Sequence, residues 1–135
     1  MQTSDIEKKL EQDAEFDENL IQENNCPGLG DFLNACMERS GISRADCISM
    51  LGIDRSYGYQ ILNGTRVPTR ECLIRIGLLF GLSVEDFQRM LNIAGRSSLY
   101  VKNMLDAKVF YAIKHKMNYE DAVAFVWENA ADDLS

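Results

Sequence analysis

The chain has 135 residues, enough for one compact domain with an appendage, and its 46% apolar and 26% charged residues are typical of a folded globular protein. No apolar run approaches the roughly 20 residues of a membrane span, and the acidic N-terminus lacks the basic-then-apolar layout of a signal peptide, so we expect a cytoplasmic protein without a membrane partner. The net charge of −7 argues against a partner made of phosphates, unless the charge is unevenly distributed.

The acidic residues are concentrated in an N-terminal arm, which we place at residues 1–27. Residues 1–25 hold eight acidic residues against two lysines, a net charge of −6, and this leaves 12 basic and 13 acidic residues in residues 26–135. Ser4 and Glu7 match a capping box, so the arm is predicted to be helical. The rest of the chain is therefore nearly neutral.

The strongest helical pattern follows a break at residues 25–28, where proline and glycine oppose a continuing helix. Five apolar side chains then recur at i, i+3, i+4, i+7 and i+8, which is one full face of a helix. They are Leu29, Phe32, Leu33, Cys36 and Met37. We expect this face to be buried and the helix to end at Ser40-Gly41.

Two shorter helices joined by one tight turn come next, at Arg44–Leu51 and Asp54–Leu62. The turn centres on Gly52, the side chain of Asp54 caps the second helix, and Asn63-Gly64 can adopt the left-handed conformation that ends it. Two helices packed closely at a steep angle form the helix-turn-helix, which presents its second helix to the major groove of DNA. The sequence therefore predicts DNA binding.

Two further helices, capped by Thr69 and Ser83 and ended by Gly81 and Gly95, complete five helices in a central domain at residues 28–95. No apolar alternation typical of a strand continues for more than four residues. We therefore predict an all-α fold.

The remaining residues, 96–135, are predicted to be a C-terminal extension of two helices. The first lies within Tyr100–Lys116, and the second runs from a cap at Asn118 to about residue 129. We expect the first to turn five side chains inward: Met104, Ala107, Phe110, Tyr111 and Ile113. In the second, the expected apolar stripe is Ala122, Val123, Val126 and Trp127.

Residues 29–95 resemble the lambda-repressor-like, or XRE-type, DNA-binding domain. The residues that carry the resemblance are Gly52 at the turn, Ile53 after it, Ile61 near the end of the second motif helix, Asn63-Gly64 and Pro68. It implies a five-helix domain of a bacterial or phage transcriptional regulator, with Asp54–Leu62 as the recognition helix. Because one motif reads only a few base pairs, we also expect a homodimer, formed through the fifth helix or the C-terminal pair.

The sequence departs from the family pattern at two positions. Ile48 stands where the family usually has a small residue, and Gly58 stands where it usually has Val or Ile. The resemblance implies that these two positions touch, so the exchange keeps the volume of the pair roughly constant. Its cost is that Gly58 weakens the recognition helix by about 1 kcal/mol relative to alanine.

Mapped residue by residue, the resemblance implies seven positions that face DNA: Arg44, Arg55, Ser56, Tyr59, Gln60, Asn63 and Arg66. Arg55 suits guanine edges and Gln60 suits adenine edges. Arg44, Asn63 and Arg66 suit phosphates. For Tyr59, contact with DNA and packing remain open alternatives, whereas Tyr57 is expected to pack.

The acidic arm leaves three interpretations open. It is a solvated appendage that faces away from DNA, a negative segment that covers the arginines and competes with DNA, or a helix that docks on a protein partner. A rival function also remains, in which the chain is a protein-interaction module that kept the helix-turn-helix fold but lost DNA binding.

No pattern typical of an enzyme, a cofactor site or a metal site is present in the sequence. The four cysteines form no CxxC pair and the single histidine, His115, is distant from all of them in sequence. We expect small, buried, reduced thiols and a solvated histidine near a helix C-terminus. We therefore predict a protein that is not an enzyme and needs no cofactor.

Overall fold

The computed structural model describes residues 25–128, and within them it is all-helical, as the sequence predicted. Its elements are α3 (Pro27–Ser40), α4 (Arg44–Leu51), α5 (Arg55–Asn63), α6 (Arg70–Phe80), α7 (Val84–Ile93), α8 (Met104–Lys114), α9 (Tyr119–Val123) and a π-helical segment, η1 (Ala124–Glu128). Nearly all of the predicted acidic arm, with its capping box at Ser4 and Glu7, lies outside the described residues. No helix of residues 25–128 combines the length and the apolar character needed to cross a bilayer.

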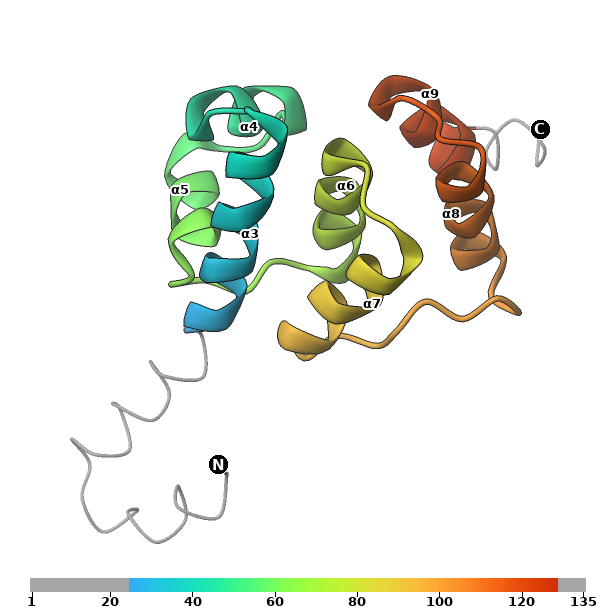
Figure 1. Cartoon of the computed structure of the whole chain (residues 1–135), viewed down its shortest axis with the longest axis horizontal. Helices are drawn as coiled ribbons and strands as arrows, with labels where there is room; N and C mark the ends of the chain where they lie inside the picture. The colour runs from blue at the N-terminus through green and yellow to red at the C-terminus, as the bar shows by residue number, and fades with distance from the viewer. Residues whose placement is uncertain (1–24, 129–135) are drawn as a thin grey trace, which may run out of the picture.

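The helices are arranged from one end of the molecule to the other (Figure 1). α3, α4 and α5 form one end, α6 and α7 the middle, and α8 and α9 the other end. α3 packs against α5, α6 and α7, while α6 also packs against α4, α7 and α9. The central helix α6 therefore connects the predicted helix-turn-helix with the C-terminal pair.

Four predicted caps hold their positions in the structure. The side-chain oxygens of Asp54, Thr69, Ser83 and Asn118 each accept a hydrogen bond from the N–H three residues later. Gly52 and Gly64 end α4 and α5 in the left-handed conformation. α5 lies one residue later than the predicted Asp54–Leu62, because Asp54 is the cap and not the first helical residue.

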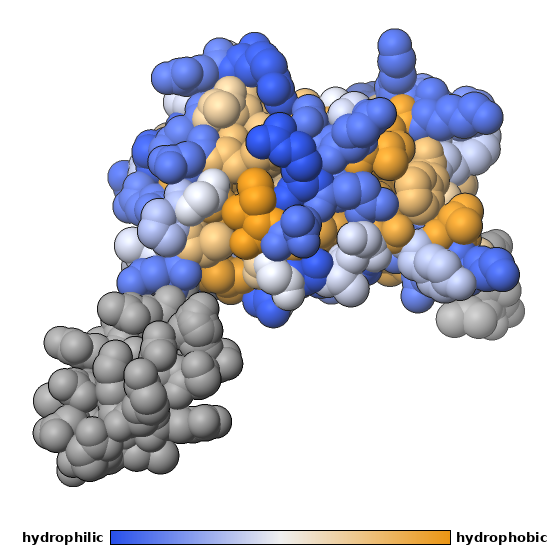
Figure 2. All heavy atoms as spheres, turned by 60° about the horizontal axis from the view of Figure 1, so that its bottom comes forward, coloured by the Kyte–Doolittle hydropathy of each residue, from blue (hydrophilic) through white to orange (hydrophobic). Residues whose placement is uncertain are grey.

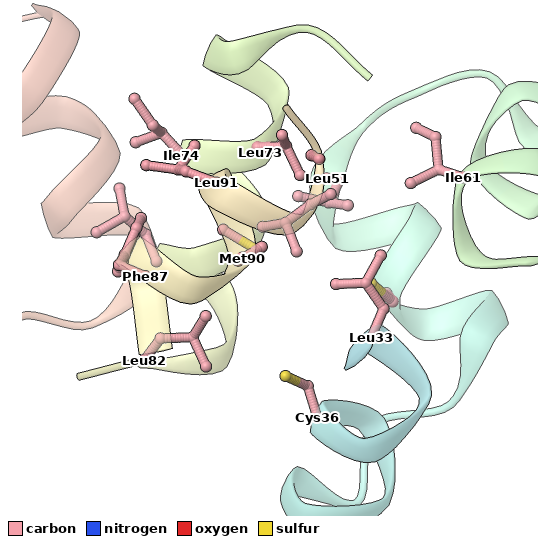
Figure 3. Packing of buried hydrophobic residues seen from close by; sticks show 14 of the residues in the cluster. Leu33, Cys36, Leu51, Ile61, Leu73, Ile74, Leu82, Phe87, Met90 and Leu91 are labelled. Atoms are coloured by element: carbon pink, nitrogen blue, oxygen red, sulfur yellow. The ribbon is translucent and has the colours of Figure 1, made fainter. Parts of the chain in front are cut away.

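One hydrophobic core runs through these helices (Figure 3). Leu33 of α3, Ile61 of α5, Leu73 of α6 and Met90 of α7 are all at most 1% exposed. The apolar face predicted for the first helix is confirmed, since four of its five side chains are buried and Phe32 is half-buried. The buried faces of α4 and α5 are thus part of the same core as the other helices.

The prediction for α8 was right in part. Of the five side chains expected to point inward, Ala107, Phe110 and Ile113 are half-buried, and the last two pack against the core. Asp106, Val109 and Ala112 are buried, whereas Met104 and Tyr111, which were expected to point inward, are 72% and 50% exposed. The carboxylate of Asp106 lies on the buried face in the first turn of the helix and interrupts the apolar periodicity. The pattern therefore pointed to a neighbouring face of the same helix.

The last predicted helix is divided in two. α9 ends at Val123, and a π-helical segment continues to Glu128. Ala122 and Val126 of the predicted stripe are buried. Trp127 is half-buried, with the guanidinium of Arg75 lying 4.7 Å from the centre of its ring.

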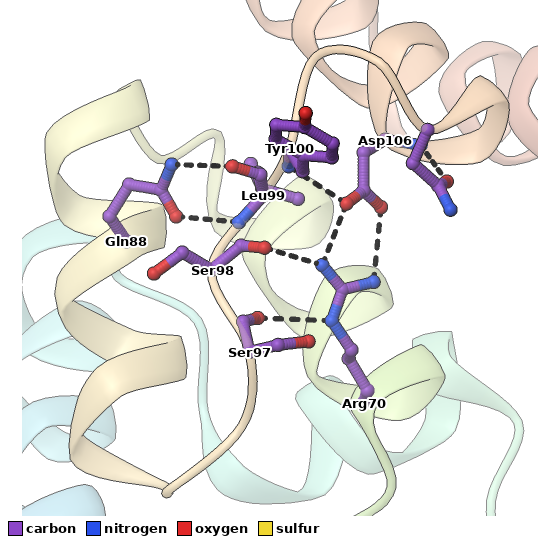
Figure 4. A network of polar contacts seen from close by, with 8 residues as sticks. Arg70, Gln88, Ser97, Ser98, Leu99, Tyr100 and Asp106 are labelled. Carbon is purple, nitrogen blue, oxygen red and sulfur yellow. Dashed lines mark hydrogen bonds and ion pairs between the residues drawn. The ribbon is translucent and has the colours of Figure 1, made fainter.

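A polar network fixes the segment that connects α7 with α8 (Figure 4). Arg70 donates two hydrogen bonds to the carboxylate of Asp106, at 3.0 and 2.8 Å. The same guanidinium donates to the carbonyl oxygens of Ser97 and Ser98, both at 3.0 Å. Asp106 also accepts the N–H of Tyr100 at 2.9 Å. The first residue of α6 thereby holds both the connecting segment and the start of α8.

Candidate nucleic-acid interface

Close packing of α4 on α5 begins with the contact between Ile48 and Gly58. Both residues are buried, and a Cβ atom built on Gly58 would lie only 2.6 Å from Cγ1 of Ile48. The isoleucine therefore fills the space that a side chain on α5 would otherwise need. The predicted contact between these two positions is confirmed.

The structure places all seven predicted DNA-facing residues on the two motif helices or directly after them. Arg44 begins α4, and Arg66 follows α5. The other five lie on α5: Arg55, Ser56, Tyr59, Gln60 and Asn63. None of the seven is fully buried, and Arg55, Ser56, Asn63 and Arg66 are exposed. Their side chains are thus accessible on the outer part of the motif.

Arg44 is held by hydrogen bonds and does not extend freely into solvent. It donates from Nη1 to Oδ1 of Asn63 at 2.6 Å and from Nη2 to Oδ1 of Asn34 at 2.8 Å. The guanidinium thereby joins the start of α4, the end of α5 and the middle of α3. Sequence reasoning did not identify Asn34, because nothing local distinguishes this residue from any other polar residue on a helix.

The two other arginines lie beside tyrosines. The guanidinium of Arg66 is 5.5 Å from the centre of the Tyr57 ring and donates a long hydrogen bond of 3.5 Å to Oε1 of Gln60. The guanidinium of Arg55 is 5.9 Å from the centre of the Tyr59 ring. Both rings are half-buried, so they restrict where these guanidinium groups can lie.

The charge on this face is modestly positive. α5 itself contains no acidic residue, and within residues 25–128 none of Arg44, Arg55 and Arg66 forms an ion pair. Two exposed acidic residues, Asp46 and Asp54, accompany the three arginines, which leaves a net charge of +1. The carboxylate of Asp54 accepts the N–H of Tyr57. A groove of about 340 Å³ runs between the helices, lined in part by Ser49, Arg55 and Tyr59. The face can therefore accept anionic and hydrogen-bonding partners.

The cysteines and the histidine form no chemical site in the described part of the chain. All four thiols are free, and burial raises the pKa of Cys47 and of Cys72 to about 11. Thiols with such a pKa stay protonated and unreactive near neutral pH. His115 is exposed and caps the end of α8, as predicted, with its ring 4.0 Å from that of Tyr111. Residues 25–128 hold no cluster of side chains suited to a metal ion.

Comparison of the chain with family models, with curated proteins and with solved structures gave no match in any of the three.

Proposed function

We propose that this chain is a sequence-specific DNA-binding regulator of transcription, of the lambda-repressor-like type, with α5 as its recognition helix. The observation that carries the proposal is the outer face of α5, where Arg55, Ser56, Tyr59 and Gln60 lie together without an acidic side chain. Arginine and glutamine read guanine and adenine edges through paired hydrogen bonds. The Arg44 and Asn63 pair at the flank of this face suits a phosphate, because both side chains are already fixed.

The packing behind α5 supports the same proposal. A recognition helix must be held rigidly if its side chains are to meet base edges at hydrogen-bonding distance. Ile61 and Leu62 of α5 are each 1% exposed, and Ile48 packs directly onto Gly58. α3 additionally packs against α5. The arrangement of α3 to α7 is the basis on which we propose the lambda-repressor-like type.

The first test measures DNA binding by the intact chain. A random pool of duplexes is put through rounds of selection, and the enriched duplex is then titrated by fluorescence anisotropy at several salt concentrations. We expect the affinity to fall steeply with salt, and the double variant Arg55→Ala with Gln60→Ala to lose about 1–3 kcal/mol of discrimination for each residue. The matched control is Arg89→Ala with Asn92→Ala, which removes the same side-chain charge and an amide from exposed positions of α7.

A shortened chain that begins at Asn25 tests the acidic arm in the same assay. If this chain binds DNA and the intact chain does not, the arm competes with DNA. If neither chain enriches any duplex at low salt, the DNA-binding proposal is wrong. The rival function, a protein-interaction module with the same fold, would then be favoured, and the half-buried Tyr57 and Tyr59 would be its first candidates.

We also propose that the regulator binds DNA as a homodimer, since two motifs are needed for specific affinity. Figure 2 shows apolar side chains reaching the surface in separate patches among hydrophilic ones. Exposed apolar side chains lie on or just before α8, at Tyr100, Val101, Met104 and Tyr111. The Tyr111 ring also lies 5.0 Å from that of Phe125, so the predicted dimer surface on the C-terminal pair remains our proposal.

Light scattering after size exclusion measures this directly. We expect the molar mass of a dimer at micromolar concentration. Replacing Tyr111 with serine should shift the mass toward that of the monomer, because the half-exposed aromatic ring would no longer be available to bury against the second copy. Lys102→Ser, at an exposed position outside α8, should leave the mass unchanged. A monomer at high micromolar concentration would contradict the proposal.

A further inference from the structure

A half-enclosed cavity of about 680 Å³ lies between the α6–α7 turn and the end of α8. None of its lining residues belongs to the candidate DNA face. We call it the α6–α8 cavity. Its lining is mostly apolar, with Leu82, Phe87, Ile113 and Met117 among the residues that form it. Its volume is in the range of about 300–1,000 Å³ that small-molecule sites occupy. The proposed DNA binding gives this cavity no role.

The floor of this cavity is rigid, because it belongs to the hydrophobic core. Phe87 is completely buried, and a Cβ atom on Gly77 would lie 2.4 Å from Cζ of the Phe87 ring. Leu82, 3% exposed, continues the same surface. A cavity with a packed floor keeps its shape without a ligand, so an occupant need not first open it.

Two lysines give the cavity a positive rim. Lys114 is the last residue of α8 and Lys116 lies two residues later, and both line the opening. Glu85 is the one acidic side chain of the lining. Within residues 25–128 neither lysine forms an ion pair. The two lysines against this one glutamate leave the lining with a net charge of +1.

The backbone at Lys116 is unusual in a way that bears on the same rim. It is the one non-glycine residue of the described chain with a positive φ, 53°, where glycine is normally preferred. Its N–H donates to the carbonyl of Ile113 and the N–H of Met117 donates to that of Ala112, both at 3.1 Å. These two hydrogen bonds are the motif that ends a helix with one left-handed residue, and a lysine in this conformation costs about 1–2 kcal/mol. The motif places the side chain of Lys116 beside the end of α8.

We propose that the α6–α8 cavity binds a small amphiphilic carboxylate. Its hydrocarbon part lies against the half-buried apolar side chains of the lining, Val84, Ile113 and Met117, above the packed core. Its carboxylate lies at Lys114 and Lys116. The apolar part of such a ligand matches the apolar lining of the cavity. Its single negative charge matches the net positive charge of two lysines and one glutamate. This site does not depend on DNA binding, since its residues lie outside the predicted DNA-facing set.

The test uses decanoate as the probe, well below the concentration at which it forms micelles, with the intact chain labelled at its methionine methyl groups. We expect the NMR signal of Met117 to shift and saturate, while those of Met50 and Met104, exposed elsewhere, stay in place. The neutral analogue decanol should bind about tenfold more weakly. The double variant Lys114→Gln with Lys116→Gln should lose about the same factor, and Lys102→Gln should lose nothing.

A glycine at position 116 separates binding from folding. Lys116→Gly should raise the melting temperature, because glycine adopts the positive φ without strain, and yet it should weaken decanoate binding. A merely structural lysine would change stability alone. The proposal is overturned if Met117 does not respond, if all exposed methionines shift together with no saturation, or if decanol binds as tightly as decanoate.

Discussion

Replacing Arg70 with methionine is expected to lower the free energy of unfolding by about 3 kcal/mol, the lower end of the range for a buried ion pair. The lower end applies because the Arg70 side chain is 28% exposed, whereas that of Asp106 is 3% exposed. The methionine keeps the apolar part of the side chain but not the guanidinium. Asp106, only 2% exposed, would then lose both hydrogen bonds from the guanidinium and keep the one from the N–H of Tyr100. The connecting segment would also lose the hydrogen bonds at Ser97 and Ser98. Urea unfolding followed by circular dichroism measures the loss.

The control for this variant is Arg89→Met on α7. Arg89 is an exposed arginine whose ion pair with Asp86 spans 3.8 Å, and pairs of this kind contribute about 0–1 kcal/mol. A double variant, Arg70→Met with Asp106→Leu, should recover much of the loss, because two apolar side chains leave no charge unpaired. If Arg70→Met cost no more than Arg89→Met, the pair would not hold the C-terminal helices to α6.

The ends of α4 and α5 were predictable from the sequence because their signals are local. Asp54 and Gly64 mark the two ends of α5 within ten residues of each other, and each acts on the backbone beside it. The contact between Ile48 and Gly58 was also accessible, since the resemblance to a known family implied which positions touch. Caps, turns and short-range packing are thus encoded where they act.

The C-terminal part was predicted less well because its signals are not local. Asp106 can be buried only because Arg70, 36 residues earlier, donates two hydrogen bonds to it. Likewise, the side chain of Gln88 bonds both the N–H and the carbonyl of Leu99, which fixes a segment without regular structure. The spacing of apolar residues along the sequence does not indicate such polar pairs between distant residues. The prediction from apolar spacing therefore placed Met104 and Tyr111 on the inward side of α8 and left out Asp106.

The candidate DNA face depends on long-range contacts in the same way. The fixed position of Arg44 requires Asn34, ten residues earlier on α3, and Asn63 on α5. The sequence alone named Arg44 and Asn63 as separate phosphate contacts. The structure joins them by a hydrogen bond of 2.6 Å, so a phosphate would meet a preformed pair rather than two mobile side chains.

Exchanging the volumes of residues 48 and 58 should reveal how strongly α4 and α5 are coupled. Gly58→Val alone is expected to destabilise the chain by about 1–3 kcal/mol, because even its Cβ would lie 2.6 Å from Cγ1 of Ile48. Ile48→Ala alone should cost about 2–5 kcal/mol, because it leaves a cavity at a side chain that is 5% exposed. The free energy of unfolding lost in the double variant should be smaller than the sum of the two single losses by at least about 1 kcal/mol.

This double-variant cycle also links the fold to the candidate interface. Ser56→Val, on the exposed side of α5, is the matched control for the unfolding measurement only, because Ser56 belongs to the predicted DNA-facing set. It places a valine on the same helix without meeting Ile48 and should cost only a few tenths of a kcal/mol. We expect each single variant to displace α5 and thereby to weaken DNA binding. The double variant should restore the position of α5 and with it the affinity for DNA. Strictly additive losses in urea unfolding would mean that the two side chains do not set the spacing of the helices. In that case the orientation of Arg55 and Gln60 would have to be attributed to α3, the other helix that packs against α5.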